Sequence, residues 1–309
     1  MAAFISLFQF LSSILRLLSH SLLWIAMYHV GLSAIPDSPT NYLNQSQLLP
    51  PPTNKLALIG IWTAHWKKER RALIRMTYLR HRPESIDYYF FICSPIAASD
   101  QLWIAFENKH YQDIVVMKCI DNSHQGKIWN FIQSVRAICE RTAGNNTNFS
   151  SHNNHNISLL IEDFPHLSDP PPSYDFIVKA DDDSYIHMSN FAPSLLSLNK
   201  TSTYYGRFWY RNTDVPFACG MLWTLSYDLL AYLAITIHND SRIIYGPEDY
   251  LIALWLIKLP VNIVDDPRKF IDHFHADSPI RGKQDNDTIC IHQLKYDVHF
   301  MEIAMYYEQ

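Results

Sequence analysis

The sequence predicts an α/β fold with a mostly parallel, mixed sheet flanked by helices, and three observations support this prediction. Short apolar runs of strand length alternate along the chain with segments whose apolar residues recur at helical spacing. Hydrophobic residues make up 48% of the 309 residues, a composition that suits a buried core and excludes a disordered chain. Three adjacent aspartates, residues 181–183, directly follow one apolar run, and open α/β sheets place ligands at such strand ends.

The predicted elements begin at residue 55. The apolar run at 55–62 predicts the first strand, and a basic helix is expected near 66–80. Aromatic residues at 86–92 predict a buried strand, and the apolar residues at 113–117 predict another. Apolar residues at helical spacing then predict a helix over 127–140. Strands and helices therefore alternate through the first half of this region.

The pattern continues in the second half of the chain. The apolar run at 174–178 predicts the strand that ends in the three aspartates. A helix is expected at 226–238, with Ser226 as its cap, and another is expected at 246–257. A short apolar run at 261–264 predicts a late strand. No internal repeat is visible, so a repeat architecture is not expected.

The N-terminal segment, residues 1–35, is predicted to be a signal anchor that crosses a membrane. Between Met1 and Asp37 the only charged side chain is Arg16, and residues 17–35 are long enough to cross a hydrocarbon core of about 30 Å. Arg16 precedes the apolar stretch, which favours a cytoplasmic N-terminus and a lumenal remainder. A cleaved signal peptide and a buried amphipathic helix are the alternatives.

Beyond this segment the sequence predicts a stem and one globular domain. Residues 36–55 are rich in Pro, Asn and Ser, as a stem would be. Residues 56–309 form the predicted globular domain, with an exposed, Asn- and Ser-rich insertion near 141–173. Seven N-x-[ST] sequons all follow the apolar segment, which favours the secretory pathway. They begin at Asn44, Asn145, Asn148, Asn156, Asn199, Asn239 and Asn286.

The net charge and the cysteines exclude several classes of protein. The formal net charge is −5, so the chain has no general basic field, and no nucleic-acid partner is expected. The five cysteines are widely spaced without a CxxC pair, which argues against a zinc module and against a small disulfide scaffold. The sequence leaves open which cysteines pair.

The three adjacent aspartates suggest a divalent cation. Alternate side chains of a strand point to opposite faces, so Asp181 and Asp183 could converge on one ion while Asp182 points to another group. Mg²⁺ and Mn²⁺ prefer such oxygen ligands and commonly bridge to substrate phosphates. The alternative is a solvated acidic loop, because short acidic motifs often have no function.

The residues around these aspartates resemble a known family. The stretch YDFIVKADDDSYI closely resembles the D-x-D segment of glycosyltransferase family 31, the β-1,3-galactosyltransferase and N-acetylglucosaminyltransferase group. Together with five further segments in the family's order, the resemblance spans roughly residues 56–296, and fungal-type members are nearest. The five are RRALIRMTY, YQDIVVMKCIDNSHQGK, FACGMLWTLSYDLLAYL, GPEDYLIALWL and DTICIHQLK. The chain departs from the family at Tyr78–Leu79, Met221–Leu222 and Ala253–Leu254, where the family has glycine or tryptophan.

The resemblance implies a GT-A fold and an inverting glycosyltransferase. Such an enzyme would move a hexose or N-acetylhexosamine from a UDP-sugar to a carbohydrate hydroxyl, with a β-1,3 linkage as the expected product. The acceptor would be a glycan, a glycoprotein or a glycolipid. The expected cofactor is Mn²⁺ or Mg²⁺, and the expected location is the Golgi membrane, as a single-pass type II protein with its catalytic domain in the lumen.

The resemblance also implies roles for the acidic residues. Asp183 is the expected main metal ligand, and Asp181 is expected to contact a metal-bound water or the nucleotide. His292 is the expected third metal ligand, through its neutral imidazole. Asp182 is expected to contact the ribose or the sugar of the donor. For His292 the alternative is a partly buried structural histidine.

Three basic residues are candidates for donor binding. Arg71 and Arg75 are spaced i, i+4, so both can lie on one helical face and approach a diphosphate or a uracil. The alternative is a solvated basic face, which is preferred for the neighbouring lysines. Lys127 starts a helix, where a positive charge is unfavourable, so a nearby anion would explain it.

Asp249 aligns with the family's expected catalytic base. An inverting transfer needs a base that takes the proton of the acceptor hydroxyl. Asp249 follows Pro247 in the first turn of a predicted helix, where the helix dipole stabilises a carboxylate. Glu248 is the second candidate, and a helix-capping carboxylate is the structural alternative.

Two other functions compete with the transferase. The first is a non-catalytic module that binds a carbohydrate or a partner on a degenerate transferase fold, which the departures from the family favour. The second is a metal-dependent hydrolase, which would need clustered histidine ligands, whereas the only tight pair is His273 and His275.

Overall fold

The structure is a computed structural model. It describes residues 55–140, 173–210, 215–237, 246–271 and 286–308. The predicted signal anchor, nearly all of the stem and nearly all of the predicted insertion therefore lie outside the described residues. Within the described ranges, no helix combines the length and the apolar character needed to cross a membrane.

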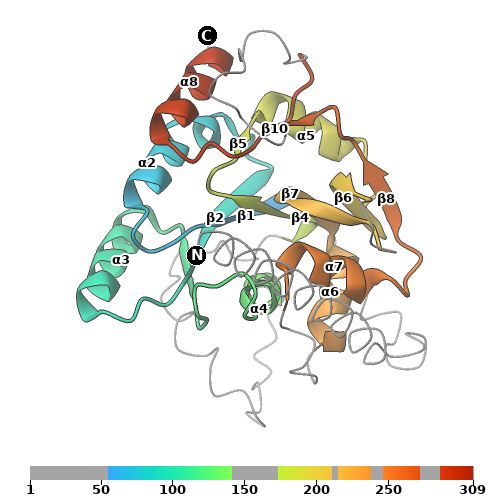
Figure 1. Cartoon of the computed structure of the whole chain (residues 1–309), viewed down its shortest axis with the longest axis horizontal. Helices are drawn as coiled ribbons and strands as arrows, with labels where there is room; N and C mark the ends of the chain where they lie inside the picture. Colours follow the sequence, from blue (N-terminus) through green and yellow to red (C-terminus); the bar gives the residue numbers. More distant parts are fainter. Residues whose placement is uncertain (1–54, 141–172, 211–214, 238–245, 272–285, 309) are drawn as a thin grey trace, which may run out of the picture.

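A seven-stranded sheet forms the centre of the molecule (Figure 1), with strand order β3-β2-β1-β4-β7-β6-β8. Neighbours are parallel in β3–β2–β1–β4 and in β6–β8, and antiparallel where β7 pairs with β4 and β6. The predicted mixed, mostly parallel α/β sheet is therefore confirmed. The strands are β1 (Lys55–Trp62), β2 (Ile86–Cys93), β3 (Ile114–Met117), β4 (Tyr174–Asp181), β6 (Thr203–Trp209), β7 (Phe217–Ser226) and β8 (Asn262–Asp265).

Helices cover both faces of this sheet, and α3 lies beside its β3 edge (Figure 1). The helices of one face are α2 (Lys68–Met76), η3 (Tyr78–His81), α5 (Met188–Leu196) and α8 (Asp297–Tyr307). Those of the other face are α4 (Lys127–Glu140), α6 (Tyr227–Thr236) and α7 (Glu248–Leu256), and α3 spans Ala98–Tyr111. A small second sheet joins β5 (Tyr185–Ile186), β10 (Cys290–Ile291) and β9 (Phe270–Ile271).

The two faces of the large sheet bury separate apolar clusters. In β1, Ala57 and Ile59 join the cluster with α5 and α8, whereas Leu58 joins the cluster with α4, α6 and α7. A strand buried on both faces reads as a continuous apolar run, which is why this strand could be predicted from sequence. Gly60 gives the Phe131 ring room, because a Cβ at this position would overlap the ring.

Three sequence expectations need correction. The basic helix expected near 66–80 is two elements, α2 and η3, which meet at Thr77. Ser226 precedes α6, but its hydroxyl does not cap the helix; it accepts a hydrogen bond of 2.9 Å from the N–H of Thr203 in β6. Helix α3 was not predicted, because only Ile104 in it is buried, which leaves no apolar stripe to recognise.

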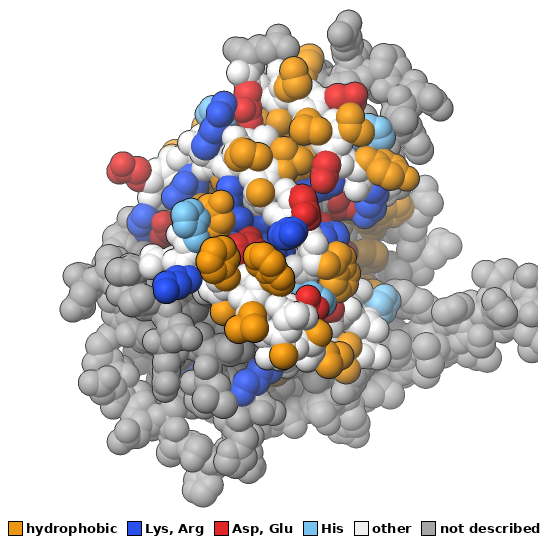
Figure 2. All heavy atoms as spheres, turned by 90° about the vertical axis from the view of Figure 1, so that its left-hand side faces the viewer, with side chains coloured by type: hydrophobic (Ala, Val, Ile, Leu, Met, Phe, Trp, Pro, Cys, Tyr) orange, Lys and Arg blue, Asp and Glu red, His pale blue; other side chains and the backbone are white. Residues whose placement is uncertain are grey.

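Helix α3 instead presents large apolar side chains to solvent. Leu102, Trp103 and Phe106 are all more than half exposed. Figure 2, which views the α3 side of the molecule, shows apolar side chains mixed with lysines and arginines over this face.

A disulfide bridge fixes the strand edge next to α3. Cys93, the last residue of β2, is bonded to Cys119, which follows β3. The bridge closes a loop between residues 26 positions apart. It resolves the pairing that the sequence left open, and it ties the short edge strand β3 to its neighbour.

Candidate functional site

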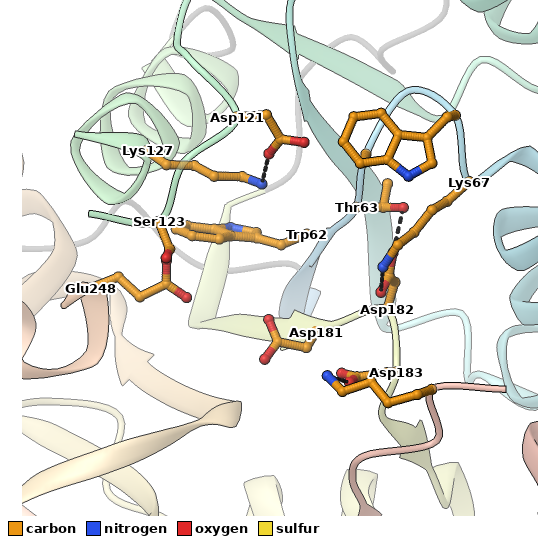
Figure 3. Close-up of a pocket in the computed structure, with 13 residues that line it drawn as sticks. Trp62, Thr63, Lys67, Asp121, Ser123, Lys127, Asp181, Asp182, Asp183 and Glu248 are labelled. Atoms are coloured by element: carbon orange, nitrogen blue, oxygen red, sulfur yellow. Dashed lines mark hydrogen bonds and ion pairs between the residues drawn. The ribbon is translucent and has the colours of Figure 1, made fainter. Parts of the chain in front are cut away.

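The chain turns as it leaves β4, so the side chain of Asp182 points away from those of Asp181 and Asp183. Asp181 is the last residue of β4, in register with Trp62 of β1. The N–H of Asp182 donates to the Trp62 carbonyl at 3.1 Å, and the N–H of Ser184 donates to the Asp181 carbonyl at 3.1 Å. Figure 3 shows the resulting arrangement of the three side chains around a cavity.

Asp181 and Asp183 converge on His292, as the sequence predicted for two of the three aspartates. The ligand atoms of these three residues all lie within 4.8 Å of one another. His292 Nε2 is 3.2 Å from Asp183 Oδ1 and 3.7 Å from Asp181 Oδ2. The small sheet brings them together, because β10, directly before His292, pairs with β5, which follows the aspartates. The N–H of Leu294 also donates to the Asp183 carbonyl at 3.0 Å.

Lysines occupy the outer oxygens of both carboxylates. Lys179 Nζ lies 2.9 Å from Asp181 Oδ1, and the ammonium of Lys295 contacts Asp183 Oδ2. Burial alone would raise the pKa of Asp183, but hydrogen bonds and charge from His292 and Lys295 hold that pKa well below its usual range. The inner oxygen of Asp183 therefore belongs to an ionised carboxylate that faces an imidazole. This set of two carboxylates and one imidazole has the chemistry of a site that could hold a divalent cation.

A cavity of about 360 Å³ adjoins this cluster, a volume typical of small-molecule sites. Five parts of the chain line it: the end of β1 with the β1–α2 connection, the segment that leads into α4, the aspartates, the first residue of α7 and the C-terminal segment (Figure 3). The lining residues are Trp62, Thr63, Ala64, Trp66, Lys67, Asp121, Ser123, Lys127, Asp181, Asp182, Asp183, Glu248 and Lys295. Three cationic and five anionic side chains therefore line the cavity.

Asp182 holds the β1–α2 connection. Its Oδ1 is 2.7 Å from Lys67 Nζ, and its Oδ2 accepts a hydrogen bond of 2.7 Å from the Thr63 hydroxyl. Its carbonyl accepts a hydrogen bond of 3.1 Å from Arg70. The expected contact with a donor would compete with these bonds, because both carboxylate oxygens are already engaged.

The structure does not bring Arg71 and Arg75 to the cavity. Arg71 has no exposed surface and donates to Glu107 at 2.6 Å and 2.9 Å. Arg75 donates to both oxygens of Asp113 at 2.7 Å and 2.8 Å. The two arginines do share a helical face, as predicted, but that face meets carboxylates of α3 and of the β3 start. Neither residue lines the cavity.

Lys127 does line the cavity, at the first position of α4. Its Nζ lies 2.6 Å from Asp121 Oδ1, so a carboxylate of the chain itself is the nearby anion that the sequence led us to expect. Its ammonium also lies 5.2 Å from the centre of the Trp62 ring. Lys127 is thus fixed at the cavity wall by one ion pair and one aromatic contact.

The two acidic residues of α7 lie in different surroundings. Glu248 lines the cavity, and its Oε1 is 3.1 Å from Lys179 Nζ. Asp249 does not line the cavity; its carboxylate accepts a hydrogen bond from the N–H of Gly220 in β7. A Cβ at Gly220 would lie 2.6 Å from Asp249 Oδ2, so only glycine leaves this carboxylate room.

The surroundings of Asp249 make it a weak acid. Burial, opposed by the charge of Lys179 and reinforced by Glu248 and Asp181, raises the pKa of Asp249 to about 7. Its Oδ1 is buried without a hydrogen-bond partner among the described residues. Burial also raises the pKa of Glu248, although Lys179 opposes the shift. Both carboxyl groups of this helix turn therefore hold protons more tightly than exposed ones.

Sequence reasoning missed several residues of the site. Lys67 was assigned to a solvated face, whereas it binds Asp182 at the cavity. Lys179 and Lys295 were part of the matched segments, but nothing in the sequence showed which carboxylates they would meet. Asp121 also lay in a matched segment, YQDIVVMKCIDNSHQGK, but nothing in the sequence showed that it would pair with Lys127.

The comparisons with known proteins give one curated relative. No family model matches the chain. Over 199 residues the chain is 25% identical to the beta-1,3-galactosyltransferase pvg3 of Schizosaccharomyces pombe, and the match covers 55% of this chain and 53% of that protein. The chain therefore spans about half the length of the curated relative it matches.

Solved structures of glycosyltransferases are similar only at a distance. The galactosyltransferase LgtC, in complex with donor and acceptor sugar analogues, matches with a TM-score of 0.41 and 9% identity, over 76% of this chain and 86% of that one. The glycosyltransferase GlyE of Streptococcus pneumoniae matches with a TM-score of 0.35 and 10% identity, over 70% of this chain and 46% of that one. Scores this low support no assignment.

Proposed function

We propose that the protein is a UDP-sugar-dependent glycosyltransferase that moves a hexose or N-acetylhexosamine to a carbohydrate hydroxyl. The observation that carries this proposal is the convergence of Asp181, Asp183 and His292 beside a cavity lined by lysines. The similarity to a beta-1,3-galactosyltransferase supports the reaction class. The ordered sequence motifs support membership of glycosyltransferase family 31, a GT-A fold and a β-1,3 linkage.

Asp181, Asp183 and His292 would hold the divalent cation, Mn²⁺ or Mg²⁺. When bound, the cation would supply positive charge against the negative charge that develops on the UDP leaving group. The rim lysines Lys67 and Lys295 would add charge near a diphosphate, since each lies at the cavity on a flexible stem.

Asp249 is the proposed base of an inverting transfer, with Glu248 as the alternative. A general base works best when its pKa lies near the working pH, and the pKa of Asp249 is raised to about 7. Asp249 Oδ1 has no hydrogen-bond partner in the described chain and could accept a proton. Glu248 is closer to the cavity, but Lys179 already binds its carboxylate.

The test is turnover of UDP-sugars by the purified full chain. We expect release of UDP from one donor of a panel (UDP-galactose, UDP-N-acetylglucosamine, UDP-glucose) that requires Mn²⁺ and increases when an acceptor glycan is added. Chelation with EDTA should abolish it, because the carboxylate cluster alone cannot stabilise the leaving group. Metal-dependent binding of UDP without turnover would instead identify a binding module. Cleavage of phosphoesters regardless of acceptor would identify a hydrolase.

We also propose that the globular domain lies in the Golgi lumen, behind an N-terminal type II anchor. The Cys93–Cys119 disulfide supports an oxidising compartment. Of the seven sequons, those at Asn199 and Asn286 lie in the described residues, and both asparagines are exposed. The acceptor, whether glycan, glycoprotein or glycolipid, would then be met at the membrane.

Glycosylation in eukaryotic cells checks this location. The expressed full chain should run faster on a gel after treatment with a peptide-N-glycosidase. The variants Asn199→Gln and Asn286→Gln should each lose one glycan, since exposed sequons of a lumenal chain are acceptors. A chain that carries no glycan and is not protected from protease in intact vesicles would contradict the proposed location.

A further inference from the structure

Lys179 is a buried lysine whose ammonium meets three different parts of the site. Its side chain has no exposed surface. Its Nζ donates to the Gly220 carbonyl at 2.8 Å and lies 2.9 Å from Asp181 Oδ1 and 3.1 Å from Glu248 Oε1. An ammonium has three N–H donors, so these three acceptors can satisfy all of them.

The three acceptors that Lys179 contacts belong to the metal cluster, to the first turn of α7 and to the strand that binds the proposed base. Asp181 belongs to the cluster with His292, Glu248 begins helix α7, and Gly220 is the residue of β7 that receives the Asp249 carboxylate. With its Oδ1 on Lys179, Asp181 keeps its Oδ2 toward His292. One side chain therefore joins the strand of the metal cluster to the helix of the proposed base.

The cost of burying this charge is large unless its partners are fixed. A buried ammonium needs both counter-charges and hydrogen bonds, and Asp181 with Glu248 supplies them. The ring of Trp62, 4.8 Å from Nζ, adds a cation–π contact. Burial lowers the pKa of Lys179, but the charges of Asp181, Glu248 and Asp249 outweigh it and keep the lysine charged.

We infer that Lys179 is a positioning residue that fixes Asp181 and the first turn of α7 in one arrangement. This inference rests on the proposed function, because it gives the metal cluster and the base a common support. A simpler role is that of a counter-charge that only neutralises the surrounding carboxylates. The two roles predict opposite effects on metal affinity.

The variant Lys179→Met separates them by the sign of the change in the Mn²⁺ dissociation constant. Removal of a positive charge beside Asp181 would strengthen Mn²⁺ binding if the lysine were only a counter-charge. If it positions Asp181, we expect Mn²⁺ to bind the full chain about tenfold to a hundredfold more weakly, as for outer partners of metal ligands. Isothermal titration with MnCl₂, in the absence and presence of UDP, measures this. Unchanged or stronger binding would overturn the inference.

The variant Glu248→Gln tests the other contact of Lys179. It leaves the contacts of Lys179 with Asp181 and Gly220 in place, so we expect Mn²⁺ affinity to stay unchanged. The kcat should fall by about tenfold, because the first turn of α7 loses its ion pair. If Lys179→Met does not fold, as judged by circular dichroism, this variant decides: an unchanged kcat would overturn the inference.

Lys200→Met is the matched control. The ammonium of Lys200 lies 2.7 Å from the carboxylate of Asp175, which, like Asp181, is in β4. The Lys200 side chain is 62% exposed and does not line the cavity. Neither Mn²⁺ affinity nor kcat should change in this variant. Failure of the proposed function is a separate result: wild-type protein that binds Mn²⁺ but turns over no UDP-sugar would disprove the enzyme, whereas the titrations of Lys179→Met would still test the positioning role.

Discussion

Replacement of Asp183 with Asn is expected to abolish Mn²⁺-dependent binding of UDP and to lower turnover more than about a hundredfold. Loss of a side chain that only supports a metal ligand costs about 10- to 100-fold, and loss of a ligand itself should cost more. Asp183 is the most tightly held member of the cluster, with His292 at 3.2 Å from one oxygen and Lys295 on the other. The amide keeps the size of the side chain but loses its charge. A cation would then meet one carboxylate and one imidazole in place of three ligands.

The same substitution is expected to destabilise the fold near neutral pH. The pKa of Asp183 is lowered in the folded chain, so its ionised form contributes stability above the ordinary carboxyl pKa, and this contribution is lost as pH falls through the lowered value. Asn cannot contribute in this way. The difference in unfolding free energy between wild type and variant, measured in urea at several pH values, should therefore shrink in acid.

A control and an opposing result define this prediction. Asp266→Asn removes a carboxylate that pairs with Lys269 at 2.8 Å outside the cavity lining, and it should leave UDP binding unchanged. The metal site is assigned wrongly if Asp183→Asn binds Mn²⁺ and UDP as tightly as wild type does.

Replacement of Asp249 with Asn is expected to lower kcat by about 10²- to 10⁴-fold, the usual contribution of a general base. Binding of Mn²⁺ and UDP should be unaffected, because Asp249 is outside the metal cluster and the cavity lining. Initial rates measured over a range of donor concentrations give the donor KM and kcat separately and test this prediction. A larger loss of kcat in Glu248→Gln than in Asp249→Asn would move the base to Glu248.

The pH dependence follows from the raised pKa of Asp249. A base must be ionised, so the rate of the wild type should rise as pH increases through about 7 and then level off. The folded chain also holds this proton more tightly than the unfolded chain, so stability from Asp249 is lost as pH rises through about 7. Asp249→Asn avoids that loss and should unfold at higher urea than wild type at pH 8. No stabilisation at this pH would contradict the burial of the charge.

The sequence predicted the central part of the fold because its strands are buried on both faces. Strand β1 reads as a nearly continuous apolar run, and β4 contains the apolar stretch 176–178. The segment that resembled a known motif placed the end of β4 at the aspartates. Helix α3, with a single buried residue, had no periodic signal. Local pattern thus predicted several elements that the core fixes, but it predicted neither the edge helix α3 nor α5, α8, β6 and β7, which also contribute to the core.

For the site, the sequence predicted which residues would lie together better than it predicted which side chains would form ion pairs. The convergence of Asp181 and Asp183 followed from strand alternation, and His292 from its motif position. Arg71 and Arg75 were expected at a diphosphate, but Glu107 and Asp113 bind them instead. Charge pairs between residues far apart in the chain depend on the tertiary fold, so no spacing rule could have found them.

The bonds of Asp182 bear on how such a motif can be probed. Its carboxylate and its carbonyl oxygen accept hydrogen bonds from Thr63, Lys67 and Arg70, which lie more than a hundred positions earlier in the chain. Conversion of all three aspartates to alanine, a common way to inactivate an enzyme, would break the side-chain bonds of Asp182 as well as remove the proposed metal ligands Asp181 and Asp183. An inactive triple mutant could therefore have lost either the metal ligands or the arrangement of the β1–α2 connection. Only substitutions made one at a time distinguish these two causes.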